Sequence, residues 1–293
     1  KQGWLNDPNG LFYFNGLWHM FFQHNPFSYE WGSMHWGHAI SSDLLHWKEQ
    51  EIVLYPDKLG TMFSGSAAID YENCSDLKKG ANPPILLYYT AAGSEAPEKL
   101  KFTQCMAYSD DGGATWQKYS DNPRVAHIAA DNRDPKIVRH NESGNWIMAL
   151  FLEDCPADKS KGVYAILSSR DLKNWTREHL IEMSGTECPD FFEVAFENDP
   201  SKKKWVFTNA CSDYLVGSFD GSKFTPEQKS IRAYERVHDE YLRAYAAQTY
   251  FNTPDNRTIQ IAWLLRREKA IPFGQLMSLP LEFSLSECAG KTI

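Results

Sequence analysis

The chain has 293 residues, 14% of them aromatic, and a formal net charge of −8 at pH 7. A chain of this length can bury a large core. The negative charge and the lack of a basic stripe argue against nucleic acid or an anionic membrane surface as a partner, and no apolar run is long enough to span a bilayer.

The chain begins with a polar cluster, Asn6-Asp7-Pro8-Asn9-Gly10, directly ahead of a predicted strand at 11–14. Asp and Asn before proline favour a turn-like backbone, and Asn-Gly continues the turn. Taken alone, the cluster is more simply interpreted as a polar turn that starts a strand. The turn Asn15-Gly16 and a second apolar run at 18–22 complete a predicted hairpin.

The same unit of polar cluster, strand, turn and strand occurs four more times. The second strands of the five units begin at residues 18, 85, 146, 205 and 259, a period of roughly 54 to 67 residues that suits a blade of about four strands. An Asp-containing turn followed by an aromatic residue comes after four of the hairpins, as expected for the outer hairpin of a blade. The later polar clusters are Phe63-Ser64-Gly65-Ser66, Arg133-Asp134-Pro135, Glu187-Cys188-Pro189-Asp190 and the segment starting at Tyr245. We therefore predict an all-β fold, a five-bladed β-propeller.

This fold predicts where the polar clusters meet. If the strand after each cluster is the innermost of its blade, all five clusters face the central axis from one rim. Asp7, Asp134 and Glu187 then converge on one funnel, although they lie far apart in the sequence. The segments expected to line the mouth of this funnel are Glu72–Gly80, Ser94–Phe102 and Pro156–Lys161.

Two of these acids suit the chemistry of glycoside hydrolysis, which needs one ionised and one protonated carboxyl group across a pocket. Asp7 has polar neighbours, which should keep it ionised as a nucleophile. Glu187 stands near Phe191 and Phe192. A less polar setting raises the pKa of a carboxyl group, and a raised pKa suits a general acid at neutral pH.

The third acid, Asp134, follows Arg133, whose positive charge should keep the Asp134 carboxylate ionised. A charged acceptor at this place can hold sugar hydroxyls. A local ion pair without a catalytic role is an equally good interpretation of the dipeptide alone.

The cysteines argue against a metal centre. All six lack CxxC spacing and a Cys/His cluster, so we expect no metal site and no other cofactor. Their even number permits disulfides without showing them. The chain starts at Lys1 without a methionine, as a processed or trimmed chain does, and we expect a secreted, periplasmic or cell-surface location.

The motifs resemble those of glycoside hydrolase family 32, the β-fructofuranosidases, which include invertases, inulinases, levanases and related fructosyltransferases. The resemblance covers residues 3 to 285. It rests on four motifs in the family's order and near its spacing: Trp4-Leu5-Asn6-Asp7-Pro8-Asn9-Gly10, Phe63-Ser64-Gly65-Ser66, Arg133-Asp134-Pro135 and Glu187-Cys188-Pro189-Asp190.

The resemblance implies a role for each site residue. Asp7 resembles the nucleophile that forms a fructosyl-enzyme, Glu187 the acid/base, and Asp134 the residue that stabilises the transition state and binds fructose hydroxyls. The residues implied to bind substrate are Trp4, Asn6, Gln23, Trp31, Phe63, Ser64, Arg133, Tyr245 and Trp263.

The resemblance also implies a domain organisation. Residues 1–285 are expected to form the catalytic propeller, and residues 286–293 a linker or the start of a truncated C-terminal region. The β-sandwich that usually follows the propeller in this family is not expected in this chain.

Our first interpretation is a retaining β-fructosidase whose partner is a fructose-containing oligo- or polysaccharide. A fructosyltransferase shares every catalytic residue and differs only in the acceptor. An arabinan-cleaving propeller of family 43 would share the fold and three acids, but Asn-Asp-Pro-Asn-Gly with Glu-Cys-Pro-Asp favours the fructosidase. A non-catalytic sugar-binding propeller would have no need for all three acids. The choice between sucrose, inulin and levan stays open.

Overall fold

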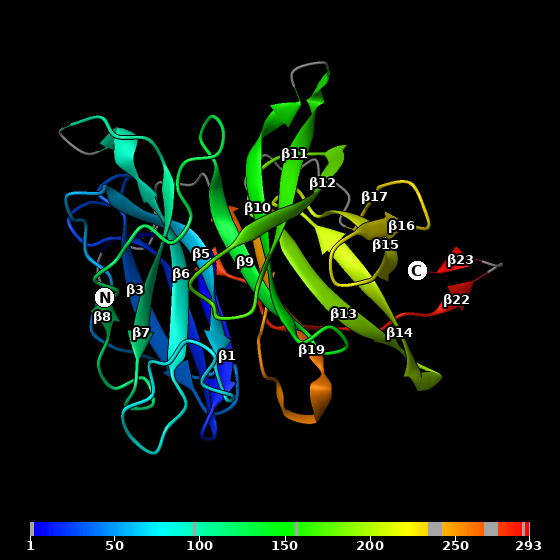
Figure 1. The fold of residues 1–293 in the computed structure, drawn as a ribbon, viewed down its shortest axis with the longest axis horizontal. Coiled ribbons are helices and arrows are strands. Elements are labelled where there is room, and N and C mark those ends of the chain that lie inside the picture. The colour runs from blue at the N-terminus through cyan, green and yellow to red at the C-terminus, as the bar shows by residue number, and fades with distance from the viewer. Residues whose placement is uncertain are drawn as a thin grey trace.

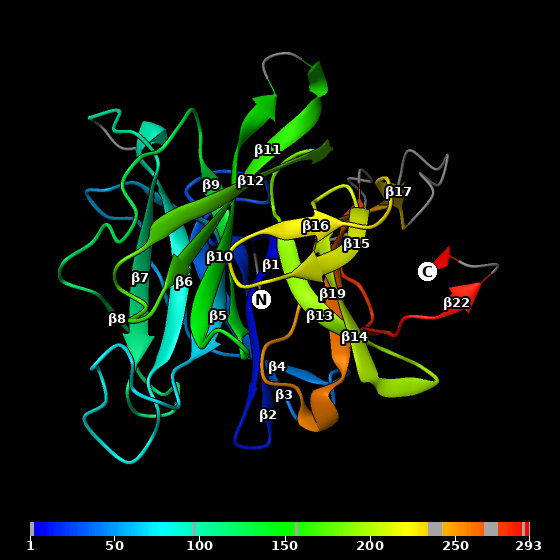
Figure 2. The ribbon, with the colours of Figure 1, turned by 45° about the vertical axis from the view of Figure 1, so that its right-hand side comes forward.

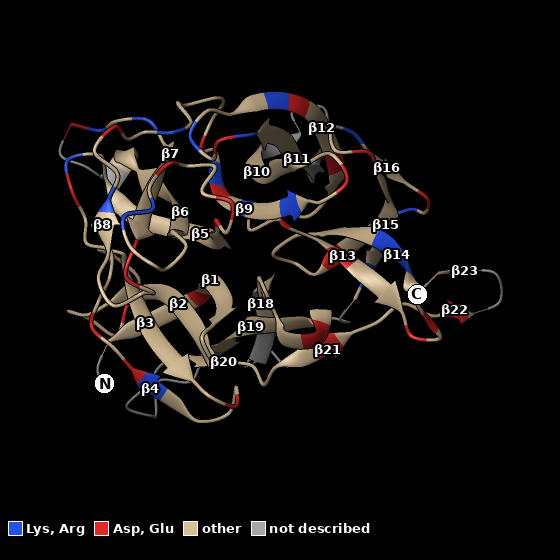
Figure 3. Ribbon diagram, turned by 60° about the horizontal axis from the view of Figure 1, so that its bottom comes forward, with Lys and Arg blue, Asp and Glu red and all other residues tan. Residues whose placement is uncertain are grey.

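The structure, a computed structural model, describes residues 3–95, 98–155, 158–233, 242–266, 275–288 and 291–292. Its strands form five antiparallel sheets, which we call blades one to five in chain order (Figures 1 and 2). Figure 3 shows these blades as a ring, with β1, β5, β9, β13 and β18 nearest the centre. The predicted five-bladed β-propeller is therefore confirmed.

Blades one to three each have four strands in consecutive order. Blade one contains β1 (Trp4–Phe14), β2 (Leu17–Asn25), β3 (His35–Ser41) and β4 (Trp47–Glu49). Blade two contains β5 (Thr61–Ile69), β6 (Ile85–Ala92), β7 (Thr103–Ser109) and β8 (Gln117–Lys118). Blade three contains β9 (Arg133–His140), β10 (Asn145–Cys155), β11 (Asp158–Ser169) and β12 (Thr176–Ser184).

Blades four and five depart from this pattern. Blade four contains β13 (Asp190–Phe196), β14 (Asp199–Thr208), β15 (Asp213–Phe219) and β16 (Phe224–Pro226), and β17 (Ile231–Arg232) also pairs with β15. Blade five contains β18 (Leu242–Thr249), β19 (Thr258–Arg266), β20 (Leu276–Met277) and β21 (Leu281–Phe283). Because β20 and β21 both pair with β19, the described part of this blade has three rows instead of the expected four.

Three short elements lie outside the five blades. Two are 3-10 helices, Gly93–Glu95 and Pro254–Asn256. The third is a hairpin of β22 (Glu287–Cys288) and β23 (Lys291–Thr292), which projects from the ring near β14 (Figure 2). Leu285, just before this hairpin, exchanges backbone hydrogen bonds with blade four. The domain boundary expected near residue 285 stays a prediction.

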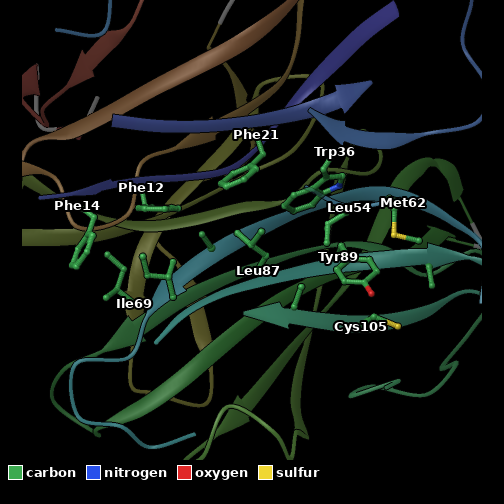
Figure 4. Close-up of a cluster of buried hydrophobic side chains, with 14 residues drawn as sticks. Phe12, Phe14, Phe21, Trp36, Leu54, Met62, Ile69, Leu87, Tyr89 and Cys105 are labelled. Atoms are coloured by element: carbon green, nitrogen blue, oxygen red, sulfur yellow. The ribbon is translucent and has the colours of Figure 1, made fainter. Parts of the chain in front are cut away.

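The apolar runs of the middle strands follow from the fold. A blade is covered on both faces by its neighbours, so a middle strand is buried on both sides. In β6, Leu87 and Tyr89 pack in the core between blades one and two, and Leu86 and Tyr88 pack in the core toward blade three. Figure 4 shows the first of these cores, with Phe21 and Trp36 of blade one facing Leu87 and Tyr89.

The outer hairpins have the turn chemistry that the repeat predicts. In each of the four, an Asp side chain accepts backbone N–H groups from residues two or three positions later, as an Asx-turn does. These residues are Asp43, Asp111, Asp171 and Asp220.

The ring is closed between its first and last blades by backbone hydrogen bonds. Tyr13 N donates to Phe251 O at 3.1 Å, and Phe251 N donates to Leu11 O at 2.9 Å. Closure leaves each blade with a neighbour on both faces, which protects the sheets' apolar side chains from water.

A buried ionic cluster connects blades three, four and five near the axis of the ring. Lys136 Nζ lies 2.8 Å from Asp190 Oδ1 and donates to Thr249 O at 2.8 Å and Thr249 Oγ1 at 3.0 Å. Asp190 also accepts the Thr249 N–H at 2.7 Å. All three side chains are buried. The cluster therefore joins the innermost strands of three blades.

Candidate active site

The polar clusters of blades one, two, three and five lie within the innermost strands, not in turns before them. In β1 the register shifts between Asn6 and Pro8, and Asp7 has no partner on β2. In β5 the register shifts between Phe63 and Gly65, which leaves Ser64 without a partner on β6. The residues that favour turns have therefore produced bulges, because pairing along the whole strand overrides the local preference. A bulge bends its strand and redirects a side chain, here at the candidate site.

Similar irregularities occur at the same rim in the other blades. Arg133 and Lys136 pair with β10, but Asp134 between them does not, and its φ is +64°. The register of β18 shifts directly after Tyr245. In blade four, Glu187 has φ +35° and lies three residues before β13, so it belongs to the connection into the innermost strand and not to the strand itself.

The three acids gather at one end of the axis, as predicted. Cys188, next to Glu187, reaches between the other two acids: its Sγ donates to Asp7 Oδ2 at 3.6 Å and to Asp134 Oδ2 at 3.4 Å. Its backbone N–H donates to Asp134 Oδ2 at 3.0 Å. Burial, followed by the charges of Asp134 and Asp7, raises the pKa of the Cys188 thiol, which keeps it a proton donor.

Asp7 has a less favourable setting for its charge than its polar neighbours in the sequence suggest. Burial raises the pKa of the Asp7 carboxyl, and the charge of Glu187 raises it further. The hydroxyl of Ser64, which donates to Asp7 Oδ2 at 2.7 Å, lowers this pKa in opposition. Burial, which depends on side chains that other blades supply, therefore opposes the polar setting predicted from the sequence neighbours of Asp7.

Glu187 has a different setting from the predicted one. Arg133 donates to Glu187 Oε2 from Nε at 3.1 Å and from Nη2 at 2.7 Å, and the Tyr245 hydroxyl donates to Oε1 at 2.6 Å. Phe191, expected nearby, instead packs in the core between blades three and four. Cationic and polar donors therefore surround this carboxyl group, in place of the expected apolar side chains.

Asp134 is buried. Its Oδ2 lies 3.7 Å from Arg133 Nε, whereas Arg133 donates its shorter hydrogen bonds to Glu187. Burial raises the pKa of the Asp134 carboxyl, and the positive charge of Arg133 opposes this shift without cancelling it. Thr90 Oγ1 accepts the Asp134 N–H at 2.9 Å and donates to Gln104 at 2.6 Å. These two buried side chains hold the strained backbone of Asp134 in place.

Two aromatic groups flank the acids. On one side, the ring of Trp263 lies 6.1 Å from the rings of both Trp4 and Tyr245, and Trp4 Nε1 donates to Asn6 Oδ1 at 2.7 Å. On the other side, Trp31 and Phe63 have ring centroids 5.8 Å apart. The structure thus brings these predicted substrate-binding residues to the same rim as the acids.

Gln23 lies opposite Asn6 in the register of β1 and β2. Its side chain is buried and its Nε2 has no hydrogen-bond partner. An unpaired buried amide is costly, so such a group commonly serves a ligand.

Sequence reasoning missed Thr90 and Gln104, which support the Asp134 backbone, and Lys136, which pairs with Asp190. Only Lys136 carried a signal, its place directly after Arg133-Asp134-Pro135. One predicted segment of the funnel mouth, Glu72–Gly80, is at the wrong end. Glu72 lines a cavity of about 440 Å³ at the opposite end of the axis, because this segment follows the far end of β5. Pro156 and Ala157 lie outside the described residues.

Three of the described cysteines, Cys74, Cys105 and Cys188, are free. Within the described ranges, no group of three or more His, Cys, Asp or Glu side chains is placed to hold a metal ion. No helix in that part of the chain is long and apolar enough to cross a membrane.

All 293 residues match the family model of the glycosyl hydrolases family 32 N-terminal domain. The chain therefore belongs to glycosyl hydrolase family 32, as its motifs suggested.

Named relatives show which activities occur on this scaffold. A levanase of Bacillus subtilis is 34% identical over 310 residues, covering 97% of this chain and 43% of the levanase. An extracellular exo-inulinase of Aspergillus niger is 30% identical over 341 residues, covering all of this chain and 62% of the inulinase. This chain thus spans about half the length of these relatives.

Among solved structures, a variant fructofuranosidase from Schwanniomyces occidentalis, complexed with fructosylnystose, is similar with a TM-score of 0.83 and 33% identity. The match covers 97% of this chain and 57% of that one.

Proposed function

We propose that this chain is the catalytic propeller of a retaining glycosidase that cleaves β-fructofuranosidic bonds in sucrose or in fructans such as inulin and levan. One observation carries the proposal: Asp7, Asp134 and Glu187, from blades one, three and four, meet at one end of the axis in a chain of this family. The names of the levanase and the exo-inulinase support a fructan substrate.

The proposed reaction has two steps. The Asp7 carboxylate attacks the anomeric carbon of the fructosyl unit while the bond to the leaving oxygen breaks and Glu187 gives that oxygen a proton. Glu187 then takes a proton from water, whose oxygen displaces Asp7 from the anomeric carbon. Because Ser64 occupies Asp7 Oδ2, the attacking oxygen is Oδ1.

The hydrogen bonds around Glu187 suggest how bound substrate changes the partners of this proposed acid. Arg133 and Tyr245 both donate hydrogen bonds to the Glu187 carboxyl group. A bound fructosyl unit offers hydroxyls that compete for the Arg133 N–H groups. This competition would free Glu187 to face the leaving oxygen.

The other side chains at this rim would hold the sugar. Asp134 accepts hydrogen bonds from fructose hydroxyls and stabilises the positive charge that develops in the transition state. Gln23 has a free donor for a further hydroxyl. The aromatic residues Trp4, Trp31, Phe63 and Trp263 would wall the subsite, together with Asn6.

The acid assignment can be tested with Glu187→Gln. Turnover of sucrose or fructan should fall on the order of 10²- to 10⁴-fold, which is what general acid catalysis typically contributes. A fructoside with a good leaving group should be slowed less, and mass spectrometry should find a fructosyl group on the peptide that contains Asp7. Glu142→Gln, at an exposed carboxyl of the opposite end, is the control. Equal slowing of both substrates would refute the assignment.

A fructosyltransferase remains the second candidate, because it needs the same acids. Chromatography of products from sucrose, inulin and levan separates the two activities: hydrolysis releases fructose, whereas transfer lengthens oligosaccharides. A secreted location is also part of the proposal. It is supported by the extracellular exo-inulinase and tested by finding the protein in the culture medium of its source.

A further inference from the structure

Exposed aromatic side chains are concentrated at the rim of the candidate active site. Of the described residues, five aromatic side chains are more than half exposed. One of the five, Tyr71, lies at the end of the axis opposite the candidate active site. The four at the site rim, all from blade one and the segment that follows it, are Phe27, Tyr29, Trp31 and Tyr55, with exposed fractions of 81%, 52%, 51% and 53%. A gathering of large apolar groups at one surface commonly marks a binding site.

Two of these side chains are linked through a buried histidine. The ring of His35 lies 5.7 Å from the ring of Phe27 and 5.5 Å from the ring of Tyr55. We call Phe27, His35 and Tyr55 the outer aromatic strip. The strip therefore has two exposed rings, Phe27 and Tyr55, on either side of one buried ring.

Phe27 of the strip and Trp31 of the candidate subsite lie in the same connection between β2 and β3. Phe63 contacts Trp31 and is followed by Ser64, the hydrogen-bond donor to Asp7. From Asp7 the strip leads outward across blade one. His35 is on β3, two strand spacings or roughly 10 Å from β1. Tyr55 follows Leu54, which bridges to the outer side of β3, so it lies roughly 14 Å from β1.

The strip is held in place although it is exposed. Asn25 Oδ1 accepts the Phe27 N–H at 3.1 Å, and Asn25 Nδ2 donates to Glu30 O at 2.9 Å, which ties down the connection between β2 and β3. Lys118 donates to the Tyr55 carbonyl and pairs with Asp57 at 2.6 Å. These hydrogen bonds hold the backbone that carries the strip, and a backbone ordered in advance lowers the entropic cost of binding a ligand.

We propose that the outer aromatic strip binds the part of a fructan chain that extends beyond the sugar next to the cleaved bond. This inference rests on the proposed function and adds a substrate class to it: fructan chains, in preference to sucrose. Sugar rings have an apolar C–H face that stacks on aromatic rings. A disaccharide has only one ring beyond its fructosyl unit, too little to reach along a strip that lies roughly 10 to 14 Å from β1. The strip is useful only to a longer chain.

The test compares kcat/KM for a fructan with kcat/KM for sucrose in the Phe27→Ala/Tyr55→Ala variant. We expect the ratio of fructan to sucrose to fall about tenfold, with levan and inulin assayed separately. Tyr71→Ala, an equally exposed ring at the opposite end, is the matched control and should leave the ratio unchanged. An unchanged ratio in the double variant, or an equal fall after Tyr71→Ala, would overturn the proposal.

A binding measurement separates this inference from the proposed reaction. In an Asp7→Asn background, affinity electrophoresis in levan- or inulin-containing gels should show retardation that the double variant weakens. If the parent protein has no fructosidase activity but the double variant still weakens retardation in the gels, the proposed reaction is refuted and the proposed fructan binding by the strip is supported. If the double variant instead changes the sedimentation of the protein and leaves fructan binding intact, the strip is a protein interface and the proposal fails.

Discussion

The Ser64 hydroxyl donates a 2.7 Å hydrogen bond to Asp7 Oδ2, from the first strand of blade two to the first strand of blade one. Both residues are the unpaired members of bulges in their strands. The hydrogen bond lowers the pKa of a carboxyl group whose burial raises it. A contact between two blades therefore controls how far the proposed nucleophile is ionised.

The first prediction follows from this contact. The nucleophile must be ionised, so activity should be lost as pH falls through the pKa of Asp7. Ser64→Ala removes a hydrogen bond that favours the ionised form, so the acid limb of the kcat/KM profile for sucrose should move to higher pH. Ser66→Ala is the control, because the Ser66 hydroxyl bonds the backbone of blade three and not an acid. An acid limb that stays in place would show that Asp7 does not set it.

The second prediction concerns stability. Because burial raises the folded-state pKa of Asp7, folding favours the protonated form of this carboxyl group. The resulting stability is lost as pH rises from 3.8, the ordinary pKa, through the folded-state pKa. At neutral pH the charged Asp7 therefore destabilises the fold. Asp7→Asn should melt at a higher temperature than the parent at pH 7, and the difference should vanish below pH 3.8.

Asp43 provides a control of opposite sign. The backbone N–H and ring of His46, with the N–H of Leu45, hold the pKa of Asp43 below its usual range. The hydrogen bonds to Asp43 stabilise the fold at pH values above the ordinary pKa of this carboxyl group, and this stability is lost as pH falls through the folded-state pKa. Asp43→Asn should therefore lower the melting temperature at pH 7. A melting curve for Asp7→Asn that is lower than the parent's at pH 7 would contradict the sign of the Asp7 shift.

The third prediction concerns the ionic cluster on the axis. Lys136→Met leaves Asp190 buried and charged without its cation, which typically costs about 3 to 5 kcal/mol. Lys136→Met/Asp190→Asn removes both charges and still offers Thr249 an acceptor, so it should cost less than Lys136→Met alone. Urea unfolding measures both. The single variant Asp190→Asn completes the cycle, and if its cost and that of Lys136→Met simply add in the double variant, Lys136 and Asp190 are not coupled as their 2.8 Å distance indicates.

The fourth prediction is stereochemical. Asp7 and Glu187 belong to blades one and four, which are not adjacent, and meet across a narrow ring. A retaining site has carboxyl groups about 5 to 5.5 Å apart, and an inverting site roughly 6.5 to 9.5 Å. We expect retention, so NMR during the first turnovers should detect β-fructose before mutarotation. Initial release of α-fructose would assign the chain to an inverting mechanism.

The sequence alone was enough to predict the five blades. Repeated hairpins, Asp-containing turns such as that of Asp43, and apolar runs such as Ile85–Ala92 are local patterns, and the backbone forms the same unit wherever they occur. Convergence of Asp7, Asp134 and Glu187 then follows from the geometry of a closed ring.

The environment of each acid was decided only by the tertiary structure. Local residues predicted a polar setting for Asp7 and an apolar one for Glu187, but the fold buries Asp7 and surrounds Glu187 with Arg133 and Tyr245. Burial and hydrogen bonding at the axis come from side chains of different blades. How closely these side chains approach one another depends on where each innermost strand bulges. A bulge reflects competition between local turn preference and pairing along the whole strand. No short segment of sequence contains the information that decides this competition.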